Sequence, residues 1–223
     1  MTASAKLSAL GRLTSGVAHE VKNPLNAMAI HLELLRKRLG PDATPVQENL
    51  DVLHNVIGRL DRAMQGFLKF VHPQELAPTA VYLNDLLGQI VALLSPEWEP
   101  RAVQFEVHPD PTLDQVVADP ELLHQAFLNI ALNACQAMPH EGTIQIATQR
   151  DGTMVRISFH DEGVGIPAED LEKIFSLYYT AKPDGSGVGL SLVYRIVQLH
   201  DGSIEVASTP GQGATFTVLI PCA

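Results

Sequence analysis

The stretch 119–138, DPELLHQAFLNIALNACQAM, decides how the larger part of this 223-residue chain folds. Its opening Asp-Pro predicts a helix start, because a carboxylate caps free N–H groups and proline suits the first helical turn. The residues that follow are largely apolar, so we expect a buried helix. Asn129 and Asn133 lie one turn apart on one of its faces. Buried amides need partners, so they either bond neighbouring backbone or face a cavity with a hydrated Mg²⁺, which prefers oxygen ligands.

Strand and helix patterns surround this helix and predict an α/β sandwich. Short strands are expected at 79–81, 103–107, 143–148, 154–159, 203–207 and 214–219, and helices at 83–94 and 190–199. Asp151-Gly152 and the turn 210–213, PGQG, predict hairpins. We therefore expect a largely antiparallel sheet with its helices on one face.

A different pattern fills residues 1–71, where apolar residues recur every three or four positions over 7–39 and again over 46–71. This spacing predicts two long amphipathic helices that form an antiparallel hairpin. A lone hairpin cannot enclose its apolar seam, so we expect a homodimeric four-helix bundle; the alternative is a hairpin that packs on its own chain. Prolines end the helical period at 72–78, which we interpret as a linker to a second domain, 79–223.

The first helical pattern contains AHEVKNP, residues 18–24. His19 falls between apolar positions and should point towards water, with Glu20 beside it and Asn23 one turn further on the same face. Pro24 should bend the helix. Imidazole titrates near neutral pH, so this histidine is either a solvated surface residue or a reactive group.

Two glycine-containing motifs lie in the second domain. Asp161 follows a predicted strand in DEGVGIP, 161–167, where it can accept a hydrogen bond from an exocyclic amine. The glycines of this motif let the backbone turn against a flat ligand, or they form a plain turn. GSGVGL, 185–190, leads into a predicted helix, whose free N–H groups suit a phosphate. The polar and aromatic stretch before it could close over a nucleotide.

Composition narrows the class of protein. The net charge of −10 argues against a nucleic-acid binder, because phosphate contacts need clustered Lys and Arg. The two cysteines, Cys135 and Cys222, have no metal-like spacing and fit a reducing, cytoplasmic setting. No run approaches the roughly 18 apolar residues of a membrane span, and no signal peptide is visible. We expect a cytoplasmic protein or the cytosolic part of a longer one, possessing no membrane segment in this chain.

Together these motifs resemble the sensor histidine kinases of two-component systems, whose ATP-binding domain belongs to the family shared with gyrase, the Hsp90 chaperones and MutL. The stretches that carry the resemblance are AHEVKNPLNAM, QAFLNIALNACQAM, DEGVGIP, IFSLYYTAK and GSGVGLSLV, in the order of the family. The resemblance covers essentially the whole chain. It departs from the usual pattern in small ways, such as Tyr178 and Tyr179 where Phe is commoner.

The resemblance implies an ATP-dependent protein-histidine kinase with ATP and Mg²⁺ as cofactors. His19 would accept the phosphoryl group, and Glu20 would orient the imidazole and act as base. The phosphoryl group would then pass to an aspartate of a response-regulator receiver domain. Asn23 would position water for a second activity, dephosphorylation of that regulator.

The resemblance also assigns the nucleotide site. Asn133 would ligate Mg²⁺ with support from Asn129, and Asp161 would bind the adenine amine. The other expected nucleotide contacts are Gly163, Gly165, Tyr179, Lys182, Gly185, Gly187, Gly189 and Leu190. Two alternatives stay open: a related serine kinase that acts on an anti-sigma-factor antagonist, and a non-catalytic scaffold whose helices only dimerise and dock a partner.

Overall fold

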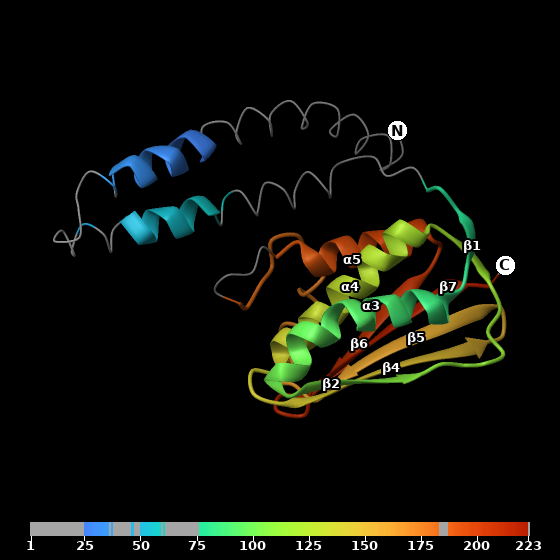
Figure 1. Ribbon diagram of the computed structural model, residues 1–223. Helices are drawn as coiled ribbons and strands as arrows, with labels where there is room; N and C mark the ends of the chain where they lie inside the picture. Colours follow the sequence, from blue (N-terminus) through green and yellow to red (C-terminus); the bar gives the residue numbers. More distant parts are fainter. Residues whose placement is uncertain are drawn as a thin grey trace. The chain divides into compact units, whose positions relative to one another are not determined.

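The computed structural model describes residues 25–35, 37, 46, 50–58, 60, 76–182 and 187–222. The chain divides into two compact units, one of residues 1–74 with 177–188, the other of residues 75–176 with 189–223 (Figure 1). The boundaries predicted from the sequence, at 71 and 79, stay predictions.

Residues 25–35 and 50–58 of the first unit are helical, as the apolar spacing predicts. Leu25 and Leu50 are buried. Most of the other large apolar side chains described in residues 25–60 are exposed: Met28, Ile30, Leu34, Leu35, Val46, Val52, Leu53, Val56 and Leu60. Exposed apolar surface on this scale marks a contact surface. His19, Glu20, Asn23 and Pro24 lie outside the described residues.

The second unit is built on a five-stranded sheet with the order β2-β4-β5-β7-β6. Its strands are β2 (Val103–His108), β4 (Gly142–Asp151), β5 (Met154–Asp161), β6 (Ser203–Ser208) and β7 (Ala214–Pro221). Neighbouring strands are antiparallel except β2 and β4, which are parallel. The largely antiparallel sheet that the sequence predicts is therefore confirmed, with the expected hairpins β4-β5 and β6-β7.

A second, two-stranded sheet pairs β1 (Thr79–Val81) with β3 (Val116–Ala118). The sequence predicts β1 but not β3, although each of these strands has only three residues. Pairing between segments far apart in sequence creates this strand.

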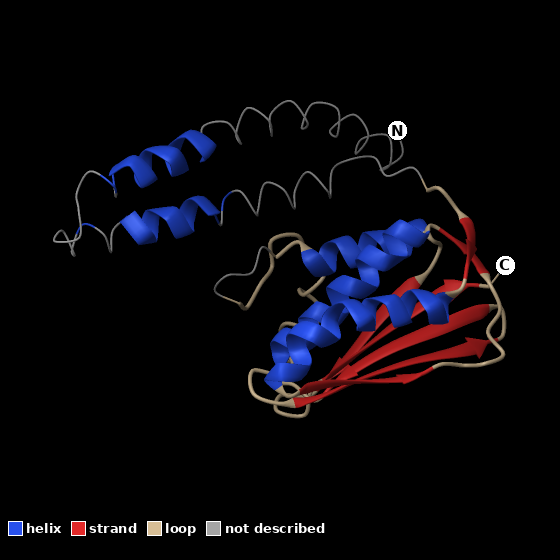
Figure 2. Cartoon of the chain, in the orientation of Figure 1, coloured by secondary structure: helices blue, strands red, loops and turns tan. Residues whose placement is uncertain are grey.

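Helices α3 (Leu83–Trp98), α4 (Pro120–Ala137) and α5 (Gly189–Leu199) cover one face of the large sheet (Figure 2). The predicted cap of α4 is confirmed, because Oδ1 of Asp119 accepts the N–H groups of Glu121 and Leu122, both at 3.0 Å. Helix α3 runs beyond its predicted end at residue 94 and contains Pro96. Trp98 is buried in this extra turn, so tertiary packing outweighs the proline. None of the helices that the structure describes is long and apolar enough to cross a bilayer.

The core lies between these helices and the sheet. Val155, Ile157 and Phe159 alternate along β5 and are fully buried, and the ring centroid of Phe159 lies 5.8 Å from that of Phe127 on α4. Cys135 of α4 is buried as well, and burial raises the pKa of its thiol to about 12, so it is an inert core residue.

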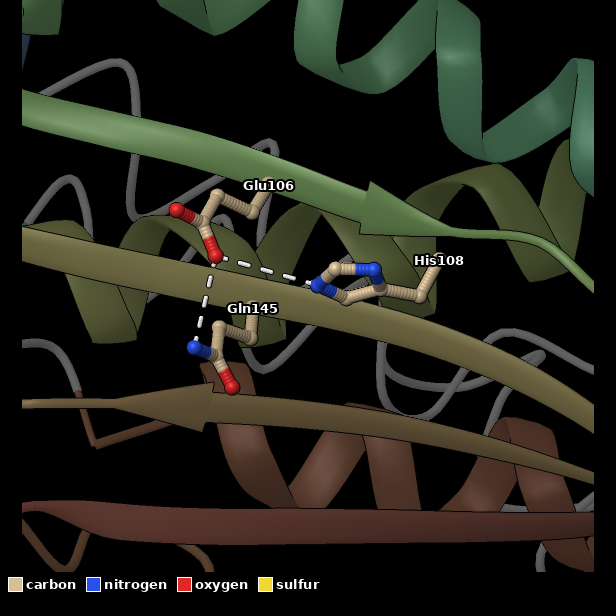
Figure 3. Close-up of polar contacts among 3 residues, drawn as sticks. All are labelled: Glu106, His108 and Gln145. Atoms are coloured by element: carbon tan, nitrogen blue, oxygen red, sulfur yellow. Dashed lines mark hydrogen bonds and ion pairs between the residues drawn. The ribbon is translucent and has the colours of Figure 1, made fainter.

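The other face of the sheet is polar. Figure 3 shows Glu106 of β2, whose carboxylate accepts a hydrogen bond from Gln145 of β4 at 3.3 Å and lies 3.7 Å from the His108 ring. These side chains are exposed. The alternation of apolar and polar residues therefore assigns one face to the core and the other to solvent.

Replacing Phe159 with Ala should lower the free energy of unfolding by about 3–5 kcal/mol, because a fully buried ring leaves a cavity against Phe127. Leu93→Ala on α3 is the control, since that side chain is 59% exposed and should change the unfolding free energy by no more than about 0.5 kcal/mol. Chemical denaturation of both variants measures the difference. Equal losses would contradict the assignment of the core.

Candidate nucleotide-binding site

The two asparagines of α4 lie beside the first residue of α5. A methyl group placed on Gly189 would lie 3.6 Å from Oδ1 of Asn129 and 4.0 Å from Nδ2 of Asn133, both ordinary van der Waals contacts. Asn129 and Asn133 are half-buried. This arrangement sets the two amide groups next to the N-terminus of α5, the end at which the helix dipole favours a negatively charged ligand.

Asp161 ends β5 and is 2% exposed. Its Oδ1 accepts the N–H of Gly163 at 2.9 Å, which turns the chain sharply after the strand. A side chain on Gly163 would come within 2.7 Å of the Cβ and the carbonyl oxygen of Ala137, at the end of α4. The same carbonyl accepts the N–H of Val164 at 3.1 Å. Glycine is required here because α4 and the loop are in contact.

One face of α4 joins these features. Asn129, Asn133 and Ala137 follow one another at intervals of four residues, so they share a face of the helix. The first two contact the start of α5, and the third contacts the loop after Asp161. The structure therefore brings together three motifs that the sequence places far apart.

The β6–β7 turn supports the loop after Asp161. Gly165 has φ +71°, and a side chain on it would lie 2.2 Å from the carbonyl oxygen of Thr209. Gly213 has φ +82°, and a side chain there would lie 1.8 Å from the carbonyl oxygen of Asp161. The N–H of Gly211 also donates to the carbonyl of Val164 at 2.8 Å.

Sequence reasoning missed this support. It interpreted PGQG, 210–213, only as a hairpin turn, although two glycines so close together were a signal of close backbone approach. Ser208 was missed too: its hydroxyl accepts the N–H of Ile166 at 2.8 Å and donates to the carbonyl of Gly213 at 2.7 Å.

The aromatic stretch before α5 makes two kinds of contact. The ring of Phe175 lies 5.9 Å from that of Tyr194 on α5. Tyr178 has φ +67°, its N–H donates to the carbonyl of Gly187 at 2.9 Å, and burial raises the pKa of its phenol. Gly187 has φ +66° and no room for a side chain against the Tyr178 backbone.

The remaining predicted residues are placed as follows. Tyr179 is half-buried, Leu190 is half-buried in the first turn of α5, and the backbone N–H of Lys182 donates to Oγ1 of Thr180 at 3.1 Å. Gly185, like His19, Glu20 and Asn23, lies outside the described residues. The predicted roles of all these residues stay predictions.

The side-chain oxygens of Asn129 and Asn133 beside α5 could bind a cation only if most of its ligands came from elsewhere. Within the described parts of the chain no three His, Cys, Asp or Glu residues gather as a metal site. The amide oxygens of Asn129 and Asn133 are neutral. They would fit Mg²⁺ only with phosphate oxygens and water completing its coordination, which is how this ion is usually held beside phosphates.

Two family models match the chain. Residues 9–75 match the His Kinase A (phospho-acceptor) domain. Residues 118–223 match the histidine kinase-, DNA gyrase B-, and HSP90-like ATPase. The second match covers α4, α5 and the Asp161 loop, the elements that build the site.

A curated relative is the sensor histidine kinase ZraS of Escherichia coli (strain K12), 39% identical over 216 residues, which are 97% of this chain and 46% of ZraS. The chain spans about half the length of the curated relatives of this kind that it matches.

Two solved histidine kinases are similar in structure. The catalytic domain of ThkA is 31% identical with a TM-score of 0.61, over 67% of this chain and 97% of that domain. ThkA in complex with the response regulator TrrA has a TM-score of 0.71 at 28% identity, over 98% and 64% of the two chains. Full-length ShkA with AMPPNP has a TM-score of 0.74 at 26% identity, over 95% and 46%.

Replacing Gly213 with Ala should destabilise the second unit far more than Gly211→Ala. Both positions have positive φ, so both variants carry the left-handed strain of about 1–2 kcal/mol. Only the new methyl at 213 meets the Asp161 carbonyl, whereas that at 211 has open space within 4 Å. The collision should cost about 1–3 kcal/mol more. Unfolding midpoints of the two variants measure this, and equal midpoints would contradict the contact.

Proposed function

This chain belongs to the sensor histidine kinases, and we propose that it binds Mg-ATP along α4, phosphorylates its own His19 and passes the phosphoryl group to an aspartate of a response regulator. One observation carries the proposal: a single face of α4 joins Asn129 and Asn133, the start of α5 and the Asp161 loop. The match of residues 9–75 to a phospho-acceptor domain supplies the acceptor. The AMPPNP complex of ShkA supports nucleotide binding in this family.

In this proposal Asp161 accepts a hydrogen bond from the adenine amine, and Gly163 and Gly165 let the backbone turn against the flat ring. Gly187, Gly189 and Leu190, at and just before the N-terminus of α5, would contact the phosphates, because a helix N-terminus favours negative charge. Gly185, Lys182 and Tyr179 complete the set of proposed contacts.

Asn133, with Asn129 beside it, would hold Mg²⁺ through amide oxygen. When bound, the ion neutralises charge on the phosphate oxygens.

The acceptor chemistry needs an imidazole with one unprotonated nitrogen. That nitrogen of His19 forms a bond to the γ-phosphorus as the bond to the β-phosphate oxygen breaks, and ADP leaves. Glu20 would accept a hydrogen bond from the other ring nitrogen, which fixes the tautomer and balances the positive charge that develops. The phosphoryl group then moves from His19 to the regulator carboxylate.

We also propose a homodimer formed through the hairpin. The exposed apolar side chains along 25–35 and 50–60 support it, because a partner hairpin would cover them. The complex of ThkA with TrrA supports a receiver domain as the second partner. A cytoplasmic location fits both the supply of ATP and the two free cysteines.

With γ-labelled ATP and Mg²⁺, the parent chain should gain label that survives base and is lost in acid, as a phosphohistidine does. His19→Gln should gain none, because an amide is no nucleophile. His31→Gln is the control, since His31 lies on the same predicted helix and is exposed, and it should label as the parent does. Acid-stable label in His19→Gln would favour the serine kinase instead. Nucleotide binding without any label would favour the scaffold.

Asn23→Ala should keep autophosphorylation and lose dephosphorylation of the phosphorylated regulator by at least about tenfold, because the amide would orient the attacking water rather than the nucleotide. Loss of label from the purified phospho-regulator measures this, with Asn26→Ala, on the same predicted helix, as the control. Unchanged dephosphorylation by Asn23→Ala would contradict the role of Asn23.

A further inference from the structure

A buried acid and a buried histidine outside the nucleotide site join the ends of two helices. Asp119 is 6% exposed and precedes α4, and His200 is 9% exposed and follows α5. The backbone N–H of Asp119 lies 2.9 Å from Nε2 of His200. Nδ1 of His200 lies 2.8 Å from the carbonyl oxygen of Ile196, one turn back on α5.

These contacts fix the state of the His200 ring. A carbonyl oxygen only accepts, so Nδ1 carries the hydrogen and donates it to Ile196. A backbone N–H only donates, so Nε2 carries no hydrogen and accepts from Asp119. The ring is therefore neutral, and each of its nitrogens is used.

The Asp119 carboxylate binds on two sides. Oδ1 caps α4 through Glu121 and Leu122, whereas Oδ2 accepts the backbone N–H of Ala77 at 2.9 Å. Burial alone would raise the pKa of this carboxyl, but the N–H donors of Ala77, Leu122 and Glu121 outweigh it and the pKa is lowered. Asp119 is thus a buried anion whose second oxygen holds Ala77, near the end of the predicted linker 72–78.

We propose that Asp119 and His200 form a clamp that makes nucleotide binding depend on how the linker is attached at Ala77. This inference rests on the proposed function of the α4–α5 site. Asp119 and His200 are positioning residues, because they act through the two helices rather than on the nucleotide.

Antiparallel packing of α4 and α5 is the physical basis. Their ends meet at Asp119 and His200, and α4 reaches the start of α5 again at Asn129 and Asn133 beside Gly189 (Figure 1). Helices are stiff over this length, so a shift at the clamped end is carried to the other end. A pull on Ala77 would act directly on the carboxylate that caps α4.

Two substitutions separate the role of Asp119 as the cap of α4 from its hydrogen bond to Ala77. Asp119→Asn keeps one oxygen for the α4 cap but replaces the acceptor of Ala77 with an amide NH₂. Ala77→Pro removes the N–H from the other side. Pro78 already restricts Ala77 to extended backbone, which suits proline. Each variant should bind AMPPNP about three- to tenfold more weakly than the parent. The double variant should bind AMPPNP no more weakly than the single variant with the lower affinity, because both substitutions remove the same hydrogen bond.

Calorimetric titration with AMPPNP and Mg²⁺, well below the unfolding midpoint, gives the readout. Asp110→Asn is the matched control: its carboxylate accepts backbone N–H groups of Thr112 and Arg150 elsewhere in this unit and should leave the affinity unchanged. His200→Gln can still accept from the Asp119 N–H and should keep affinity within about twofold, whereas His200→Leu should lose it as Asp119→Asn does.

If Asp119→Asn and Ala77→Pro both unfold more easily than the parent but bind AMPPNP with the affinity of the parent, the clamp is overturned. Asp119 is then only a structural cap of α4. Additive losses in the double variant would overturn it as well. A parent chain that itself fails to bind AMPPNP would instead overturn the proposed function, and the clamp with it.

Discussion

The packing of α4 on β5 is the constraint on which the nucleotide-binding unit depends. Phe127 and Ile130 of α4 are fully buried, and Phe127 meets Phe159 of β5 in the core. Burial of these side chains fixes the rotation of the helix about its axis. That rotation leaves Asn129 and Asn133 half-buried beside α5 rather than in the core, where unpaired amides would be costly. The positions of Asn129 and Asn133 in the candidate site therefore follow from the apolar packing of α4 on β5.

Close backbone contacts then fix the loop that follows Asp161. The Asp161 loop is held by α4 through Ala137 and by the β6–β7 turn through Thr209 and Gly213. No side chain fits at these contacts, so the loop has little freedom to move without disturbing the sheet or α4. Such rigidity fits the proposed role of Asp161 in binding the amine of a flat base, because a positioned acceptor loses less entropy on binding.

The two parts of the chain differ in what stabilises them. The second unit has a closed core between helices and sheet, while the described helices of the first leave most large apolar side chains exposed. A domain that presents its apolar surface to a partner and a domain that encloses its own are suited to different tasks. The proposed acceptor hairpin would gain stability from association, whereas the second unit encloses a core of its own. Asp119 and His200, which form the proposed clamp, both belong to the second unit.

The sequence by itself determined the local structure and the chemistry. The Asp-Pro start of α4 and the strands of both hairpins follow from the sequence, because capping, periodicity and turn residues act within a few residues of one another. Tertiary structure decided the rest: strand β3, the last turn of α3, the Gly213–Asp161 contact and the Asp119–His200 bond, whose residues are 81 positions apart. Local patterns record which face of an element is buried, but not what covers it, because that depends on how distant segments pack together.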